Sequence, residues 1–124
     1  MWDKAKAVAH LDDNAKDESQ GQCAKYVREA IEAGGVQLVH HESAKDYGSS
    51  LTAVGFAVAP ASATTAPEAG DVGIVQPIAG HPNGHMAMFD GDLWVSDFVQ
   101  QHGLYPGQAY RDLKPPFTIY RYVG

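Results

Sequence analysis

The sequence is short of the features that define several large classes of protein. It has one cysteine in 124 residues, so no disulfide can form within the chain. It has no apolar run long enough to cross a bilayer, and its first ten residues lack the apolar core of a signal peptide. Lys and Arg number 9 against 15 Asp and Glu, for a net charge of -6, and they are scattered. We therefore expect no binding to nucleic acid or to membranes, because both require clustered positive charge.

What is present suits one compact domain, residues 1–124, since 44% of the residues are hydrophobic and can form a core. Helical patterns are expected at 4–11 and from about 20 to 33, where Gly34 and Gly35 end the second helix. Strand patterns follow at 71–75, 85–89, 93–98 and 118–123. A helix followed by antiparallel strands predicts an α+β fold.

The single cysteine lies where a helix is expected to begin. Ser19 and Gln22 match a Ser-x-x-Gln capping box, which puts Cys23 in the first turn. The positive end of a helix favours a thiolate, and the free amides of the first turn, that of Cys23 included, suit an oxyanion. Position alone leaves three interpretations of Cys23 open: a buried apolar side chain, a metal ligand or a nucleophile.

A nucleophilic cysteine needs a base, and His85 is the best placed of the six histidines. It opens a strand of small and apolar residues, which would fix its ring on a rigid element and screen it from water. Gly84 beside it leaves room for a substrate. A zinc site shared with His81 is disfavoured, because Pro82 and Gly84 prevent the helical spacing that aligns two imidazoles. We expect neither a metal nor another cofactor.

The turn after this strand offers a third member of the site. If residues 90–92 form a three-residue hairpin loop, His85 lies opposite Asp97, whose carboxylate would accept the imidazole N–H and fix its tautomer. A two-residue turn would instead set Ser96 opposite His85 and place Asp97 on the other face. Asp71, at the start of another strand, is the alternative if the register differs.

Four short motifs carry a family resemblance. They read Gln-Cys-Ala-x-Tyr-Val at 22–27, Ala-Gly-Asp-Val-Gly-Ile-Val at 69–75, Gly-His-Met-Ala-Met-Phe-Asp-Gly at 84–91 and Val-Ser-Asp at 95–97. Together they resemble the CHAP and NlpC/P60 group of papain-like cysteine peptidases and amidases. The resemblance covers residues 19–123 and implies a nucleophile helix packed on an antiparallel sheet. It implies Cys23 as nucleophile, His85 as base and Asp97 as orienting residue, although the CHAP branch usually has Glu or Asn in that third place.

Papain itself has a glutamine several residues before the cysteine that completes the oxyanion hole. Six residues before the cysteine this chain has Asp17, which cannot donate a hydrogen bond when ionised. Gln20 or Gln22 would have to substitute, and the sequence does not choose between them. Tyr47 is expected in a loop along which substrate passes.

The resemblance implies hydrolysis of amide bonds in bacterial peptidoglycan, either between glycan and stem peptide or within the stem. A small, acidic catalytic domain of this kind resembles the amidase effectors of type VI secretion. We then expect a protein made in the cytoplasm, secreted without a signal peptide and active in the target cell's periplasm, with an immunity protein as partner. Two alternatives stay open: a papain-like toxin that cleaves or deamidates a cytosolic protein, and a degenerate domain that only binds.

Overall fold

The structure, a computed structural model, describes all residues from 1 to 124. Its four α-helices are α1 (Lys4–Asn14), α2 (Cys23–Ala33), α3 (Gly48–Thr52) and α4 (Gln108–Leu113). Short 3-10 turns occur at η1 (Ala44–Asp46) and η2 (Ala61–Thr64). The strands are β1 (Phe56–Val58), β2 (Val72–Val75), β3 (His85–Phe89), β4 (Trp94–Val95), β5 (Val99–Gln100) and β6 (Phe117–Tyr122). None of the helices is long and apolar enough to cross a membrane.

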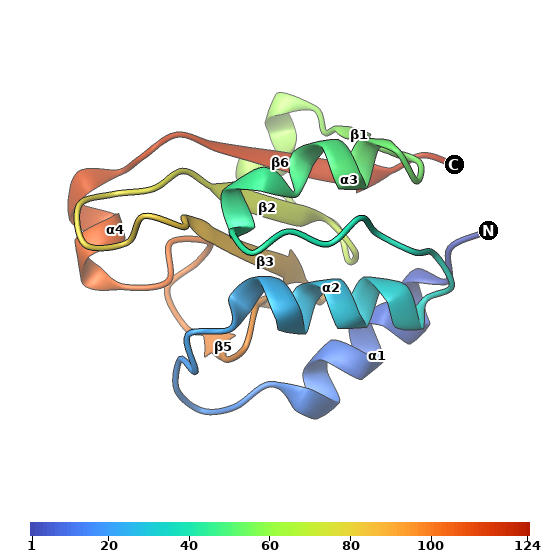
Figure 1. The fold of residues 1–124 in the computed structure, drawn as a ribbon, viewed down its shortest axis with the longest axis horizontal. Helices are drawn as coiled ribbons and strands as arrows, with labels where there is room; N and C mark the ends of the chain where they lie inside the picture. The colour runs from blue at the N-terminus through green and yellow to red at the C-terminus, as the bar shows by residue number, and fades with distance from the viewer.

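The six strands form one antiparallel sheet in the order β1-β6-β2-β3-β4-β5. The last strand of the chain, β6, therefore lies between β1 and β2. In Figure 1, α1 and α2 lie along one side of the sheet, α4 lies at one end, and the two termini lie near each other at the other end. This arrangement confirms the expected α+β class.

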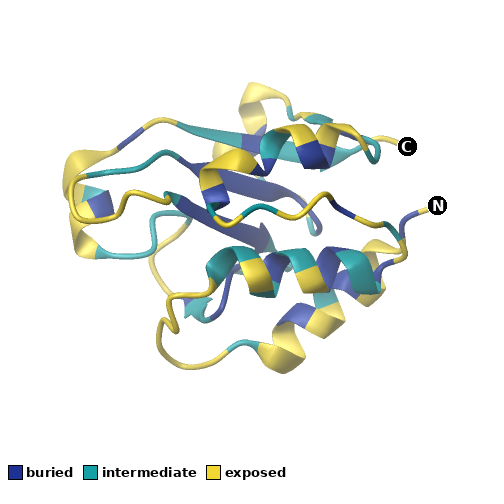
Figure 2. Ribbon diagram, viewed as in Figure 1, coloured by how far each residue is buried: buried dark blue, intermediate teal, exposed yellow.

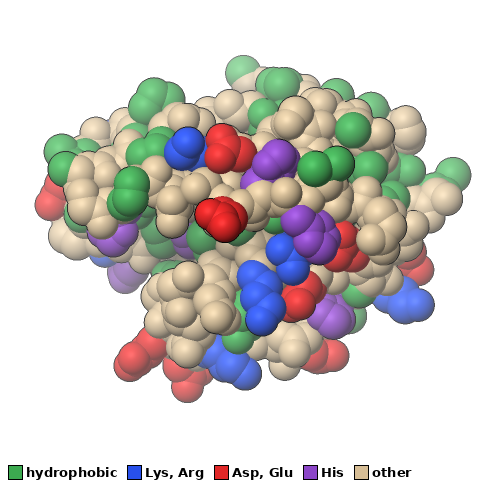
Figure 3. All heavy atoms as spheres, viewed as in Figure 1, with side chains coloured by type: hydrophobic (Ala, Val, Ile, Leu, Met, Phe, Trp, Pro, Cys, Tyr) green, Lys and Arg blue, Asp and Glu red, His purple; other side chains and the backbone are tan.

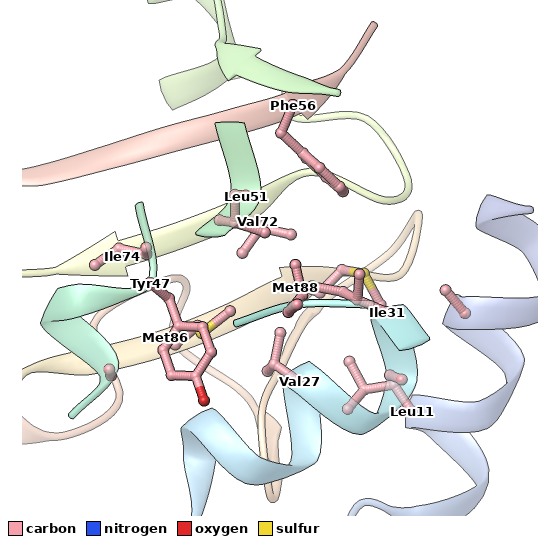
Figure 4. Close-up of a cluster of buried hydrophobic side chains, with 14 of the residues drawn as sticks. Leu11, Val27, Ile31, Tyr47, Leu51, Phe56, Val72, Ile74, Met86 and Met88 are labelled. Atoms are coloured by element: carbon pink, nitrogen blue, oxygen red, sulfur yellow. The ribbon is translucent and has the colours of Figure 1, made fainter. Parts of the chain in front are cut away.

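Helix α2 joins the two layers because one of its faces is apolar. Val27 and Ile31 are fully buried, and Figure 4 shows them near the side chain of Met88 on β3, with Leu11 of α1 close by. The polar residues of α2 alternate with these along the helix, so Figure 2 shows both buried and exposed positions on it. The apolar face thus fixes the start of α2 relative to the start of β3.

The central strands β2 and β3 are buried on both faces, as Figure 2 shows. One face contributes to the main core with α1 and α2. The other contacts a smaller apolar cluster that contains Trp94 and Ile119, with Leu104 packed against it. Gly73 is required here, because a β-carbon at that position would overlap the side chain of Leu104.

Several sequence expectations about the elements are wrong. The first helix continues to Asn14, and the second begins at Cys23 with Gln22 as N-cap, so the proposed capping box does not form. The Ser19 hydroxyl instead accepts a bond from the N–H of Gly21. No strand spans 93–98: the chain reverses after β4 and returns as β5. The sequence analysis also missed β1 and α4.

Candidate active site

A cleft of about 740 Å³ opens at the N-terminus of α2. The first turn of α2 forms one wall, the loop from Gly80 to His85 forms another, and α4 contributes Tyr110. Cys23 and His85 both line this cleft. The structure therefore brings the two residues together from positions 62 apart in the sequence.

Cys23 is the first residue of α2 and is half-buried. The N–H groups of Cys23, Ala24 and Lys25 precede the first helical hydrogen bonds and have no carbonyl acceptor. Burial raises the pKa of the Cys23 thiol to about 11, and the carboxylate of Asp97 adds to the rise, while nearby backbone amides, that of Met86 first, lower it. Desolvation thus opposes the thiolate that the start of the helix is expected to favour.

His85 is the first residue of β3 and is only 6% exposed. Its Nε2 lies 2.7 Å from Oε1 of Gln100. The amide nitrogen of Gln100 donates to the carbonyl oxygens of Gly103 and Leu104, at 2.8 and 3.0 Å. These two bonds fix the amide so that its oxygen faces the ring, which places the imidazole proton on Nε2 and leaves Nδ1 free as a base.

Burial also lowers the pKa of His85 to about 4, although the bond to Gln100 and the charge of Asp97 oppose the shift. At neutral pH the site therefore holds a neutral thiol and a neutral imidazole. Such an imidazole accepts a proton without first having to lose one.

Asp97 does not orient His85, which corrects the predicted triad. The loop between β3 and β4 has four residues, closed by the N–H of Asp90 on the carbonyl of Leu93, so Met88 pairs with Val95 and Phe89 with Trp94. Neither of the two registers considered from the sequence occurs. Asp97 then falls in the turn between β4 and β5 rather than across from His85.

The carboxylate of Asp97 holds the segment that leads into α2. Its Oδ2 accepts hydrogen bonds from the backbone N–H groups of Gln20 and Gln22, at 2.7 and 2.9 Å, and Oδ1 accepts one from the hydroxyl of Ser96. Asp97 is 1% exposed. It is therefore placed to fix the residues directly before Cys23.

The other expected site residues divide into two groups. Gln22 and Gly84 line the cleft, although Gly84 is required chiefly because its φ is +71° and a β-carbon would overlap the carbonyl of Val75. Gln20 does not line the cleft, and its side chain donates to the carbonyl of Glu18. Of the two candidate oxyanion donors, Gln20 is therefore wrong and Gln22 remains.

Tyr47 is also not where it was expected. It is completely buried in the core, and its hydroxyl bonds to both the N–H and the carbonyl of His41. Asp71, the alternative orienting residue, does not contact His85 either, because its carboxylate forms a bidentate ion pair with Arg121. Phe98, in the turn before β5, also lines the cleft.

Gln100 is the main residue that the sequence analysis missed. It is a polar residue at the end of an apolar stretch and belongs to no motif, and only the chain reversal between β4 and β5 brings it to His85. The ring centroid of Tyr110 on α4 lies 5.3 Å from that of the exposed His81 and 6.3 Å from that of His85, with the ring planes tilted in both pairs. No group of three or more His, Cys, Asp or Glu side chains in the structure is arranged to hold a metal ion.

Comparison with solved structures gives close similarities. A chain of the type VI native effector-immunity complex Tae3-Tai3 from Ralstonia pickettii is 49% identical, with a TM-score of 0.92, covering 98% of this chain and 100% of that one. A chain of the selenomethionine form of the complex is 50% identical, with a TM-score of 0.88, covering 94% and 99%. No protein-family model and no curated protein sequence matches. The papain-like α+β fold expected from the motifs is confirmed.

Proposed function

The chain belongs to the Tae3 family of type VI effectors, and from this membership we propose that it is an antibacterial effector that hydrolyses amide bonds of bacterial peptidoglycan. Cys23 is the nucleophile and His85 the general base. The observation that supports this assignment best is the buried His85, whose Nε2 is fixed by Gln100 in the cleft that Cys23 lines. The narrower assignment to the CHAP or NlpC/P60 group stays a prediction from the motifs.

In the proposed reaction the Cys23 sulfur attacks the carbonyl carbon of the scissile amide. The thiol has a pKa of about 11 and the imidazole a pKa of about 4, so the neutral pair is favoured before the attack. The thiol proton therefore moves to Nδ1 of His85 only as the new carbon–sulfur bond forms. The N–H groups at the start of α2 stabilise the oxyanion, and the side chain of Gln22, which lines the cleft, adds a donor.

His85 then gives the proton to the leaving amine as the carbon–nitrogen bond breaks, which leaves a thioester on Cys23. A water molecule gives a proton to Nδ1 and attacks the thioester. As the carbon–sulfur bond breaks, Nδ1 returns this proton to the sulfur, which releases the acid product and restores the thiol. Throughout, Gln100 holds the Nε2–H and so keeps the ring in one orientation. No metal ion takes part in these steps.

The proposed setting follows from the same family membership. Type VI secretion would deliver the protein into the periplasm of a competitor, where peptidoglycan is accessible. The similar structures are effector-immunity complexes, so we propose that a cognate immunity protein protects the producing strain by covering this cleft. The bond cut is either that between the glycan and the stem peptide or one within the stem.

Digestion of purified sacculi tests the proposal. Wild-type protein is expected to release soluble fragments that mass spectrometry assigns to one amide bond, and Cys23→Ala is expected to release none. Thermal unfolding of Cys23→Ala serves as the control for folding. Intact sacculi with wild-type protein, together with cysteine-dependent cleavage or deamidation of proteins in a bacterial lysate, would contradict the proposal and favour a toxin that acts on a cytosolic protein.

A further inference from the structure

Two arginine side chains of similar burial have opposite surroundings. Arg121 is 22% exposed, and its Nε and Nη2 bond the carboxylate of Asp71 at 2.9 and 2.8 Å. Arg28 on α2 is 18% exposed, yet its guanidinium makes no hydrogen bond, and its Nε is a buried polar atom without a partner. A buried donor without an acceptor is rare in folded proteins and costs stability. Arg28 therefore needs an explanation that Arg121 does not.

The nearest acidic group does not satisfy Arg28. Oε1 of Glu32 lies 3.8 Å from the arginine Nε, which is beyond hydrogen-bond length. The other oxygen, Oε2, already accepts the N–H of Leu38 at 3.2 Å and contacts Nε2 of His40 at 3.1 Å. Glu32 thus supplies a negative charge beside the guanidinium but leaves its N–H groups free.

Arg28 lines the same cleft as Cys23. The two residues are five positions apart on α2, so Arg28 lies about 7.5 Å farther along the helix axis. Arg28 and Lys25 are the only Lys or Arg side chains that line the cleft. In Figure 3 positively charged side chains gather over α2 on a face with scattered acidic groups.

We propose that Arg28 is a carboxylate-binding subsite that recognises a free carboxylate of the peptidoglycan stem peptide in the same cleft as the bond that is cut. This inference rests on the proposed function. The planar guanidinium presents paired N–H donors that match the two oxygens of a carboxylate. Stem peptides carry free carboxylates at D-glutamate and at the diamino acid, and conversion of either to an amide removes the charge.

Three soluble stem-peptide substrates test the proposal: the free acid, the form amidated at D-glutamate and the form amidated at the diamino acid. Wild-type protein is expected to lose about 10- to 100-fold in kcat/KM on one of the two amidated substrates, as loss of a charged hydrogen-bonded pair requires. Arg28→Gln is expected to cut the free acid more slowly by a similar factor and to cut all three substrates at similar rates. Arg28→Lys keeps the charge without the paired donors, so its kcat/KM on the free acid should lie between those of wild type and Arg28→Gln.

Lys25→Gln is the matched control, because it removes one positive charge from the same helix and the same cleft. It is expected to change the three rates by one common factor and so to keep the wild-type preference. The thermal midpoint of Arg28→Gln should stay close to that of wild type, because Arg28 forms no hydrogen bond and loses only the long ion pair with Glu32 at 3.8 Å.

Three results would overturn the inference in distinguishable ways. Equal wild-type rates on all three substrates, or an unchanged preference in Arg28→Gln, would remove the subsite and leave the proposed function intact. A lower thermal midpoint in Arg28→Gln with an equal loss of rate on every substrate would assign the residue a structural role. A wild-type protein that cuts none of these substrates and also leaves sacculi intact would contradict the proposed function itself.

Discussion

Asp97 and Gln100 lie three residues apart in the chain reversal that ends the sheet, and each is 1% exposed. Asp97 uses its charged carboxylate on two backbone N–H groups just before Cys23. Gln100 uses its neutral amide on the imidazole of His85. One short segment therefore positions both proposed reacting groups, by different chemistry.

The difference explains the protonation state of the site. A carboxylate bonded to the imidazole would stabilise its positive form, whereas the neutral oxygen of Gln100 does so less, and burial then lowers the pKa of His85 to about 4. The negative charge instead lies on the cysteine side, where it raises the pKa of the thiol. The comparison predicts that Asp97 matters most to the fold around Cys23 and Gln100 most to catalysis.

The largest effect is expected from Asp97→Ala. The substitution leaves the N–H groups of Gln20 and Gln22 without their acceptor, so the free energy of unfolding should fall by about 4 kcal/mol, from two hydrogen bonds to a charged group. Activity should fall as well, because the residues that lead into α2 lose their anchor. Urea denaturation measures the first effect, and fragment release from sacculi measures the second.

The control for Asp97→Ala is Gln20→Ala, which shortens the side chain and keeps the backbone N–H that Asp97 binds. Its side chain reaches only the carbonyl of Glu18, so stability and activity should stay near wild type. A large loss in Gln20→Ala with a small one in Asp97→Ala would show that the side chains, and not the carboxylate, fix this segment.

The next effect is a pH dependence of stability that originates at His85. Its pKa is about 4 in the folded protein and near 6.5 in the unfolded chain, so between these values the unfolded chain binds the proton and the folded protein does not. The free energy of unfolding should therefore fall by about 3 kcal/mol as the pH drops from 6.5 to 4. Urea denaturation at several pH values measures this fall, and His85→Ala should lack it.

Wild type must be compared with His85→Ala because Asp12 changes the pH dependence of stability in the opposite direction. Burial, with Asp90 beside it, raises the pKa of Asp12 to about 6, so its contribution favours the folded state at low pH and is lost as the pH rises through 6. This contribution is common to wild type and His85→Ala and cancels in the difference. An equal acid loss in both proteins would contradict a neutral, buried His85.

The sequence predicted the elements that have strong local signals. The apolar face of α2, its glycine stop and the apolar strands expected at 71–75 and 85–89 were all readable, and so was the position of His85 at the start of its strand. The start of α2 was misplaced, because the capping residues Ser19 and Gln22 suggested a local cap. The N–H of Gln22 instead donates to the carboxylate of Asp97, more than 70 residues away in the sequence, and no local pattern reveals this partner.

The third site residue was missed because it depends on register. The loop has four residues instead of three, so the pairing between β3 and β4 is shifted by one residue. The chain then turns back after Val95, and Gln100 on β5, rather than Asp97, lies beside His85. Both loop lengths suit an Asp-Gly-Asp sequence. Tyr47 was misplaced for a different reason. Its sequence neighbours are polar, which suggested an exposed loop, whereas tertiary packing buries its ring.

The smallest of the three effects is expected from Gln100→Leu. This substitution tests most directly whether Gln100 acts on catalysis while Asp97 acts on the fold. Loss of the bond to Nε2 frees the His85 ring to turn and to change tautomer, so kcat should fall about 100-fold, as for other oriented general bases. KM should change little, because the substrate-lining groups stay in place. Gln37→Leu makes the same change at an exposed site and should leave kcat unaltered. Steady-state kinetics on a soluble stem peptide measures both constants, and a rise in KM at constant kcat would mean that Gln100 shapes the cleft and does not orient the base.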